Sequence, residues 1–148
     1  MNEVEKITPS NAVAKLPLLA AVVAIGGIID AIYLTIHHLT KELVPCAEGF
    51  DCGAVLSSQY AEIGGIPLAA FGAVAYFIAF SLAILGAFGN RQMWLLFGVQ
   101  VTLMALASSY FVYLQAFVIK AYCQYCLISA AVCFTLFFIA IISKFWKR

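Results

Sequence analysis

The chain has 148 residues, of which 65% are hydrophobic and only 10% are charged, and its formal net charge is +1. An apolar share this high excludes an ordinary soluble domain, and a charge this close to zero gives no electrostatic reason to expect nucleic acid as a partner. The length leaves room for one domain, residues 1–148. The composition therefore indicates an integral membrane protein.

Four apolar segments are long enough to cross a bilayer, which takes about 20 helical residues. Pro67 suits the first turn of the second segment, where a missing N–H costs nothing, and Gly89-Asn90 is typical of a tight turn before the third. The predicted fold class is thus an all-α integral membrane protein, a bundle of four transmembrane helices. We expect these helices at about residues 16–36, 67–88, 93–117 and 123–145.

The longest polar stretch, residues 40–66, joins the first two helices and contains Cys46 and Cys52. The apolar spacing within residues 53–63 predicts one short amphipathic helix that caps the bundle. Ser57 and Ser58 lie on this helix. Either one of them points into the bundle, or both are ordinary solvated serines.

Basic residues predict the orientation in the membrane, because loops rich in Lys and Arg face the cytoplasm. Lys41 and Lys120 are the basic residues at one set of helix ends, against six at the other. Both termini are therefore expected in the cytoplasm, and the cysteine loop 40–66 is expected to face outward. The six residues are Lys6, Lys15, Arg91, Lys144, Lys147 and Arg148.

Four of the five cysteines form two pairs at this outward face. Gly49 lets the chain fold back between Cys46 and Cys52, and a disulfide that closes so short a loop adds little stability. Cys123 and Cys126 form a CxxC motif at the start of the last helix, where unpaired N–H groups favour a thiolate. These features predict thiol–disulfide exchange, with all four cysteines as candidate catalytic residues.

Two other classes of function stay open from the residues alone. One is a thiol-based metal-binding or transport protein that also uses His37 and His38, although the spacing of the first cysteine pair is unlike a zinc site and we expect no metal. The other is a structural protein with fixed disulfides. Asp30, inside the first helix, is either functional or a structural hydrogen-bonding group, and Cys133 is expected to be a small buried hydrophobe.

Taken together, these residues resemble the vitamin K epoxide reductase family. The resemblance covers nearly the whole chain, with a loose cysteine pair first and a CxxC motif at the head of the last helix. The matching segments are Asp30-Ala-Ile-Tyr-Leu-Thr35, Cys46-x5-Cys52-Gly-Ala-Val-Leu-Ser-Ser58, Gly65-Ile-Pro-Leu-Ala-Ala-Phe-Gly72 and Cys123-Gln-Tyr-Cys126.

The resemblance implies a four-helix bundle that holds a quinone of the ubiquinone, menaquinone or vitamin K type near the CxxC motif. It implies that Cys46 meets a thioredoxin-like thiol protein and that Cys52 exchanges with Cys123. It further implies that Cys126 meets the quinone, and that Ser58 lines the quinone site.

The resemblance also bears on substrate and compartment. Vertebrate members have Tyr four residues after the CxxC motif, whereas this chain has Ala130, and its loop is more similar to prokaryotic homologues that support disulfide formation. We therefore expect a thiol:quinone oxidoreductase of a prokaryotic plasma membrane, with vitamin K epoxide or quinone reduction in the ER membrane as the alternative. Because the sequence ends just past the fourth helix, the thioredoxin-like partner is expected to be a separate protein.

Overall fold

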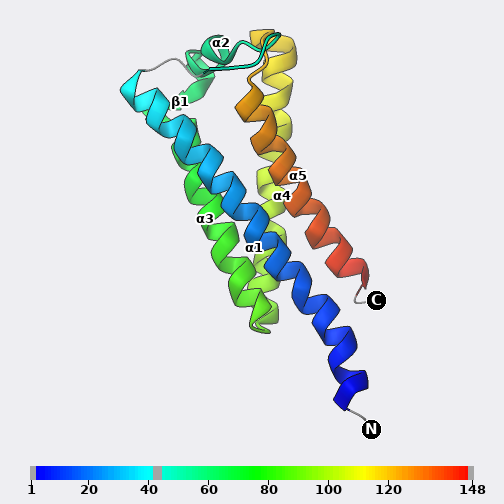
Figure 1. Ribbon diagram of the computed structural model, residues 1–148. Helices are drawn as coiled ribbons and strands as arrows, with labels where there is room; N and C mark the ends of the chain where they lie inside the picture. Colours follow the sequence, from blue (N-terminus) through cyan, green and yellow to red (C-terminus); the bar gives the residue numbers. More distant parts are fainter. Residues whose placement is uncertain (1–2, 42–44, 147–148) are drawn as a thin grey trace.

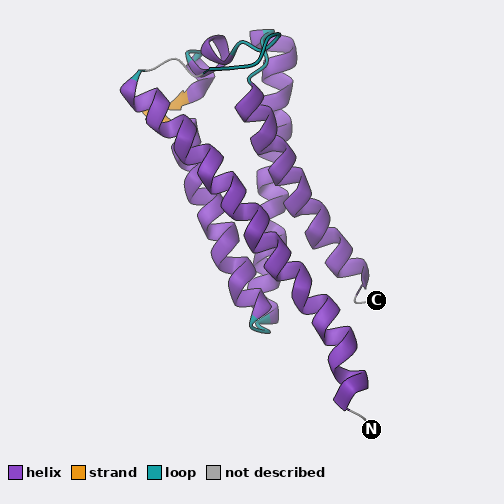
Figure 2. Ribbon diagram, viewed as in Figure 1, coloured by secondary structure: helices purple, strands orange, loops and turns teal. Residues whose placement is uncertain are grey.

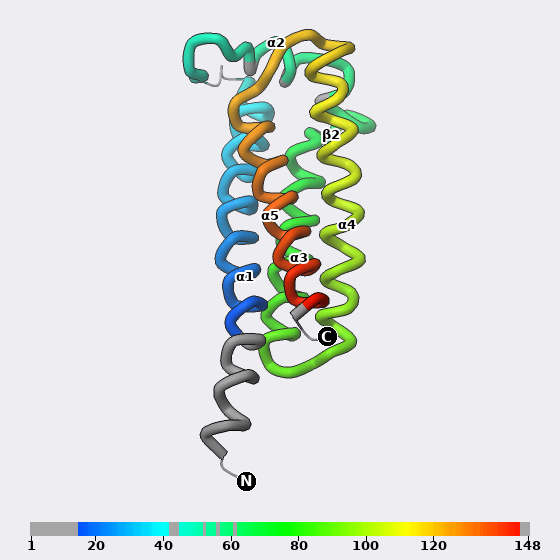
Figure 3. The backbone as a smooth tube through the Cα atoms, turned by 90° about the vertical axis from the view of Figure 1, so that its right-hand side faces the viewer, coloured from blue at the N-terminus to red at the C-terminus, as the bar shows by residue number. Residues whose placement is uncertain are grey.

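A computed structural model describes residues 3–41 and 45–146, with side chains for 15–41, 45–51, 53–55, 57–60 and 62–145. Four long helices lie alongside one another (Figure 1). The N-terminal end of the first helix and the C-terminal end of the last lie at the same end of the bundle, and the cysteine loop crosses the other end, called the loop end below (Figure 3). The helices are α1 (Glu3–Thr40), α3 (Leu68–Ala87), α4 (Arg91–Tyr113) and α5 (Gln124–Trp146).

Each of these helices carries a segment long and apolar enough to cross a membrane, which confirms the four predicted spans. Most of the predicted ends differ from the structure by one or two residues, and three of the differences matter for the site or the loop. The first span reaches Thr40, the third continues to Ile119 through the π-helical turn η2 (Leu114–Ile119), and the fourth begins at Gln124. Cys123 therefore immediately precedes its helix and does not form part of the first turn.

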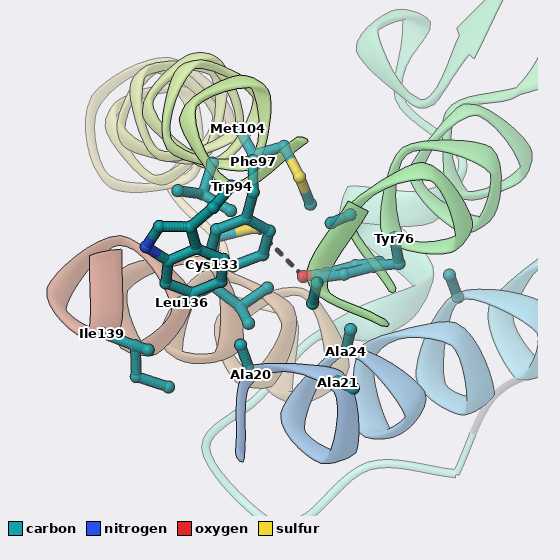
Figure 4. Close-up of a cluster of buried hydrophobic side chains, with 14 residues drawn as sticks. Ala20, Ala21, Ala24, Tyr76, Trp94, Phe97, Met104, Cys133, Leu136 and Ile139 are labelled. Atoms are coloured by element: carbon teal, nitrogen blue, oxygen red, sulfur yellow. Dashed lines mark hydrogen bonds between the residues drawn. The ribbon is translucent and has the colours of Figure 1, made fainter. Parts of the chain in front are cut away.

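The core lies along the centre of the bundle, where α1 and α4 each pack against both α3 and α5. Trp94 and Phe97 stack with ring centroids 4.5 Å apart, and Leu136 is buried beside them (Figure 4). The Trp94 indole N–H donates to Ser143 Oγ at 2.9 Å. The contact of α1 with α3 instead uses small side chains, which let two helix backbones approach closely; these are Ala20, Ala21, Ala24, Ala31, Ala79 and Ala83.

The connection between α1 and α3 is not the single helix predicted over residues 53–63. The helix ends at Ser57, because Ser58 turns to an extended conformation (φ −70°, ψ 159°) and its Oγ donates to the Val55 carbonyl at 2.7 Å. Serine side chains compete for backbone groups in this way and interrupt helices. The observed elements are α2 (Cys52–Leu56), the 3₁₀ turn η1 (Gln59–Ala61), and the strands β1 (Glu62–Ile63) and β2 (Ile66–Pro67) (Figure 2).

The two short strands form an antiparallel hairpin in which Ile63 pairs with Ile66. Gly64 and Gly65 make its turn with φ of 61° and 84°, a conformation that side-chain-bearing residues rarely adopt. Two glycines between apolar residues are the sequence signal of a two-residue hairpin, which the prediction of a helix here overlooked. Pro67 closes the hairpin as the N-cap of α3, so it immediately precedes the first turn in which the sequence had placed it.

Candidate active site

The connection from α4 to α5 holds Cys123 in place. Lys120 ends η2 in the left-handed conformation (φ 57°), and the Ala121 N–H then reaches back to the Gln115 carbonyl at 3.1 Å. The buried Gln115 side chain accepts the Cys123 N–H through Oε1 at 3.0 Å. Gln115 therefore anchors the CxxC motif from inside the bundle. We did not predict this role, although a polar residue within an apolar span is the signal that marks it.

The segment that contains Cys46 rests on the start of α5 (Figure 1). It is further ordered by Asp51, whose Oδ1 accepts the Ala54 N–H at 3.0 Å and caps α2. Three hydrogen bonds join the segment to α5 and the residues before it. The Ala47 N–H donates to Gln124 Oε1 at 3.0 Å, the Asp51 N–H to the Tyr122 carbonyl at 2.8 Å, and the Tyr125 hydroxyl to the Pro45 carbonyl at 3.1 Å.

Three of the four predicted redox cysteines meet in one small apolar cluster. Val55 of α2 and Cys123 are buried there, and Cys46 and Cys126 pack against them, each half-buried. Cys46 is disulfide-bonded, whereas Cys123 and Cys126 are free thiols. Cys52 begins α2, but its side chain lies outside the described part of the chain, so its pairing with Cys46 stays a prediction.

The surroundings of Cys123 favour a thiolate. The Cys126 thiol donates a hydrogen bond to Cys123, and this contact is the main cause that lowers the pKa of Cys123 from 9.0 to about 7. The backbone N–H groups of Cys126 and Tyr125 lower this pKa further, while burial and the charge of Asp30 act in the opposite direction. Since the thiolate is the reactive form of cysteine, Cys123 is prepared for exchange with another sulfur atom.

A cavity of about 290 Å³ lies beside Cys126 and is lined mainly by apolar side chains from all four helices. Asp30, Ser58 and Cys126, which the sequence analysis singled out, line it together. Ser58 reaches it from the loop, but its hydroxyl proton is engaged by the Val55 carbonyl. The cavity therefore adjoins the CxxC motif at Cys126, between the four helices and the loop residues Val55, Ser58 and Tyr60.

Tyr76 organises one wall of this cavity. Its hydroxyl donates to the Ser129 carbonyl at 2.7 Å and also lies 2.7 Å from Ser129 Oγ and 3.0 Å from Cys133 Sγ (Figure 4). The expectation that Cys133 is merely a small hydrophobe was therefore incomplete, because its thiol takes part in a buried polar contact. Asp30 lines the same cavity, and its Oδ2 is buried without a hydrogen-bond partner in the described part of the structure.

The two adjacent histidines have different surroundings. His38 Nε2 lies 2.5 Å from Glu62 Oε1 and so joins the hairpin to the end of α1, while the His37 ring packs on the Tyr33 ring with centroids 4.4 Å apart. Among the side chains that the structure describes, no three His, Cys, Asp or Glu residues are arranged to hold a metal ion. The side chain of Cys52 is not among those that the structure describes.

Comparisons with known proteins agree with this arrangement. The family model described as the vitamin K epoxide reductase family matches residues 18–141. The thiol-disulfide oxidoreductase LTO1 of Arabidopsis thaliana is 37% identical over 123 residues, which cover 76% of this chain and 32% of that protein. The chain thus corresponds to about a third of this relative, and the matched region of the family includes both cysteine pairs.

Proposed function

Because the chain belongs to the vitamin K epoxide reductase family and is a multi-pass membrane protein, we propose that it is a thiol:quinone oxidoreductase. It takes electrons from a thioredoxin-like protein through Cys46 and Cys52, and passes them through Cys123 and Cys126 to a quinone, which supports disulfide formation. One observation carries the proposal: Cys46 packs in one cluster with the two cysteines of the CxxC motif, and Cys126 of that cluster also lines an apolar cavity. The relative's name, a thiol-disulfide oxidoreductase, supports the same chemistry.

The proposed relay begins with a reduced partner thiolate that attacks Cys46 and breaks its disulfide, which leaves Cys52 as a thiolate. Cys52 then attacks Cys123, which breaks the oxidised CxxC disulfide and releases Cys126 as a thiolate. The partner's second thiol displaces Cys46, and Cys46 displaces Cys123 from Cys52. The partner leaves oxidised, the loop disulfide is restored, and the CxxC pair holds two electrons.

The thiols of the structure correspond to that last state, since Cys46 is disulfide-bonded while Cys123 and Cys126 are free. In this state the Cys126 thiol donates a hydrogen bond to Cys123. The CxxC pair is then reoxidised as a new disulfide forms between its two sulfur atoms. Cys126 lines the cavity and is therefore the sulfur atom placed to meet the quinone.

The cavity suits a quinone ring in size and chemistry. Ligand sites are mostly apolar with a few placed polar groups and often have volumes of roughly 300 Å³ or more, and this cavity has about 290 Å³ with Asp30 and Ser58 in its lining. The Asp30 Oδ2 is buried and has no hydrogen-bond partner among the described residues, so it offers a polar atom to a ligand. A bound quinone supplies the capacity to accept two electrons and two protons.

We further propose that the loop end faces outward from a prokaryotic plasma membrane. The support is the excess of basic residues at the opposite end, which follows the positive-inside rule. In this orientation the relay is open to thiol proteins of an oxidising compartment, where disulfides persist.

The test is quinone reduction by the purified protein in detergent, followed by absorbance with a reduced thioredoxin-like donor. We expect Cys126→Ala to abolish donor-dependent quinone loss. The control variant Thr135→Ala changes an exposed residue of α5 that does not line the cavity, and should retain it. Quinone reduction by Cys126→Ala at the wild-type rate would show that the assignment is wrong.

A trapped intermediate gives a second readout of the relay. In Cys46→Ala, Cys52 still attacks Cys123, but Cys46 is absent and cannot displace Cys123 from Cys52. A disulfide between Cys52 and Cys123 should therefore accumulate in equilibrium with the CxxC disulfide that the released Cys126 can re-form. Peptide mapping under non-reducing conditions detects it. A fixed pair of disulfides that never exchanges would support the structural reading instead.

A further inference from the structure

Asp30 occupies a costly position. It lies ten residues before the end of α1 at Thr40, which places it about 15 Å along the helix from the loop end. A carboxylate without a partner in apolar surroundings is far less stable than a neutral carboxylic acid. Yet Oδ2 of Asp30 is buried and makes no hydrogen bond to any residue that the structure describes. This oxygen therefore forms no hydrogen bond that would stabilise the described fold, and it is available to a ligand.

Two other polar side chains that line the cavity already have hydrogen-bond partners in the protein. His38 is paired with Glu62, and the Tyr76 hydroxyl is held by Ser129. No Lys or Arg lines the cavity among the described residues, and α4 with η2 contributes no titratable side chain. Besides Asp30, the titratable lining residues are His38 from α1, Tyr60 from η1, Tyr76 from α3, and Cys126 and Cys133 from α5.

We propose that Asp30 is a catalytic proton donor: in its protonated form it donates a hydrogen bond to a carbonyl oxygen of the quinone and releases its proton there as the CxxC pair is oxidised. The inference rests on the proposed function and deepens it, because it assigns to this site a residue for the proton side of the reaction.

The proton count gives such a group a role when Cys123 is a thiolate. The reduced CxxC pair, with Cys123 as a thiolate and Cys126 as a thiol, holds two electrons for transfer but only one proton. Formation of the Cys123–Cys126 disulfide releases both electrons and the Cys126 proton. Reduction of a quinone to a hydroquinone consumes two electrons and two protons, so Asp30 supplies the second proton. Asp30 is left as a carboxylate and takes up a proton from water before the next turnover.

An electrostatic interaction between Asp30 and Cys123 also supports the proposed role of Asp30. The charge of the Asp30 carboxylate acts on Cys123 in the direction that opposes thiolate formation, so the two groups are within electrostatic reach. The Cys123 thiolate is therefore more stable when Asp30 is protonated and neutral than when Asp30 is a negatively charged carboxylate. The reduced site favours the acid form of Asp30 at the stage at which its proton is needed.

The test compares the wild-type protein with Asp30→Asn, which keeps the shape of the side chain but has no acidic proton. The reduced proteins are mixed with a soluble naphthoquinone in a stopped-flow instrument across a range of pH. Naphthoquinone affinity is measured separately, and infrared difference spectra between reduced and oxidised protein report the C=O band of a protonated carboxyl. Glu48→Gln, which removes an exposed carboxyl outside the cavity, is the matched control.

General acid catalysis is worth about 100-fold or more, so Asp30→Asn should slow the single turnover by about 100-fold with naphthoquinone affinity changed less than about 3-fold. The carboxyl band should disappear in Asp30→Asn and remain in Glu48→Gln. If Asp30→Asn does not fold, Asp30→Glu decides, because the band must then shift in frequency.

Three results would overturn the inference. Asp30→Asn with the wild-type rate and pH profile would show that no proton comes from Asp30. Loss of naphthoquinone affinity equal to the loss of rate would make Asp30 a binding group only, and an unshifted carboxyl band in Asp30→Glu would assign the band to another residue. A wild-type protein that reduces no quinone would instead overturn the proposed function, and this inference with it.

Discussion

The hydrogen bond from the Cys126 thiol is the main cause of the low pKa of Cys123, and its removal gives a measurable prediction. Cys126→Ala is made in a protein in which Cys46, Cys52 and Cys133 are already alanine, so that Cys123 is the last thiol. With a pKa of about 7, about half of Cys123 is thiolate at pH 7, whereas a pKa of 9.0 leaves about 1%. We therefore expect the thiolate fraction at pH 7 to fall, by about 50-fold at most if the pKa returns to 9.0.

The assay is a pH titration of ultraviolet thiolate absorbance in detergent. The parent protein, which keeps Cys123 and Cys126, should show its first midpoint near 7, and the Cys126→Ala protein should titrate at a clearly higher pH. Cys126→Ser keeps a hydroxyl donor and should lie between the two. Because the thiolate is the reactive species, exchange at Cys123 should accelerate as pH rises through about 7 and level off above it. An unchanged midpoint in Cys126→Ala would refute the reasoning.

Two further substitutions test the supports of the site. An added Cβ at Gly27 would lie 2.5 Å from the Tyr76 ring, so Gly27→Ala should displace that ring from the cavity wall and cost about 1–3 kcal/mol in thermal or denaturant unfolding. Gly26→Ala is its control, because an added Cβ there would meet no described atom beyond its own stretch of helix within 4 Å, and equal stability of the two variants would contradict the contact. Gln115→Leu removes the acceptor of the Cys123 N–H, so hydrogen exchange at that amide should accelerate and stability should fall by about 1–3 kcal/mol; an unchanged exchange rate would show that Gln115 is not the anchor.

The four spans were predictable because a membrane leaves the chain few choices. Helices of about 20 apolar residues satisfy every backbone group internally, so hydropathy alone identified α1, α3, α4 and α5. The loop was less predictable, since its form depends on single side chains. Ser58 bonds the Val55 carbonyl and ends α2, and Gly64 and Gly65 turn the following residues into a hairpin.

The meeting of the cysteine segments followed from topology, because the loop after the first span and the start of the fourth lie at the same end of any four-helix bundle. The anchoring of Cys123 by Gln115 did not follow, since the two residues lie eight apart across a π-helical turn and a left-handed Lys120. The contact of Cys133 with Tyr76 likewise depends on how α3 and α5 pack. These contacts depend on how separate parts of the chain pack together, and a local sequence pattern does not predict that packing.

The burial of Cys123 explains why the proposed relay needs a loop pair at all. Cys123 is 0% exposed beneath the Cys46 segment and Val55, so a thiol protein in water cannot reach it in this arrangement. The three hydrogen bonds that hold the segment to the start of α5 are each worth about 0.5–1.5 kcal/mol net, and their release costs a few kcal/mol, which thermal motion supplies. A segment held this weakly can carry a sulfur atom between the partner and Cys123, while α5 keeps Cys126 fixed at the cavity. Mobility on one side of Cys123 and rigidity on the other are what a two-step transfer from a protein thiol to a buried quinone requires.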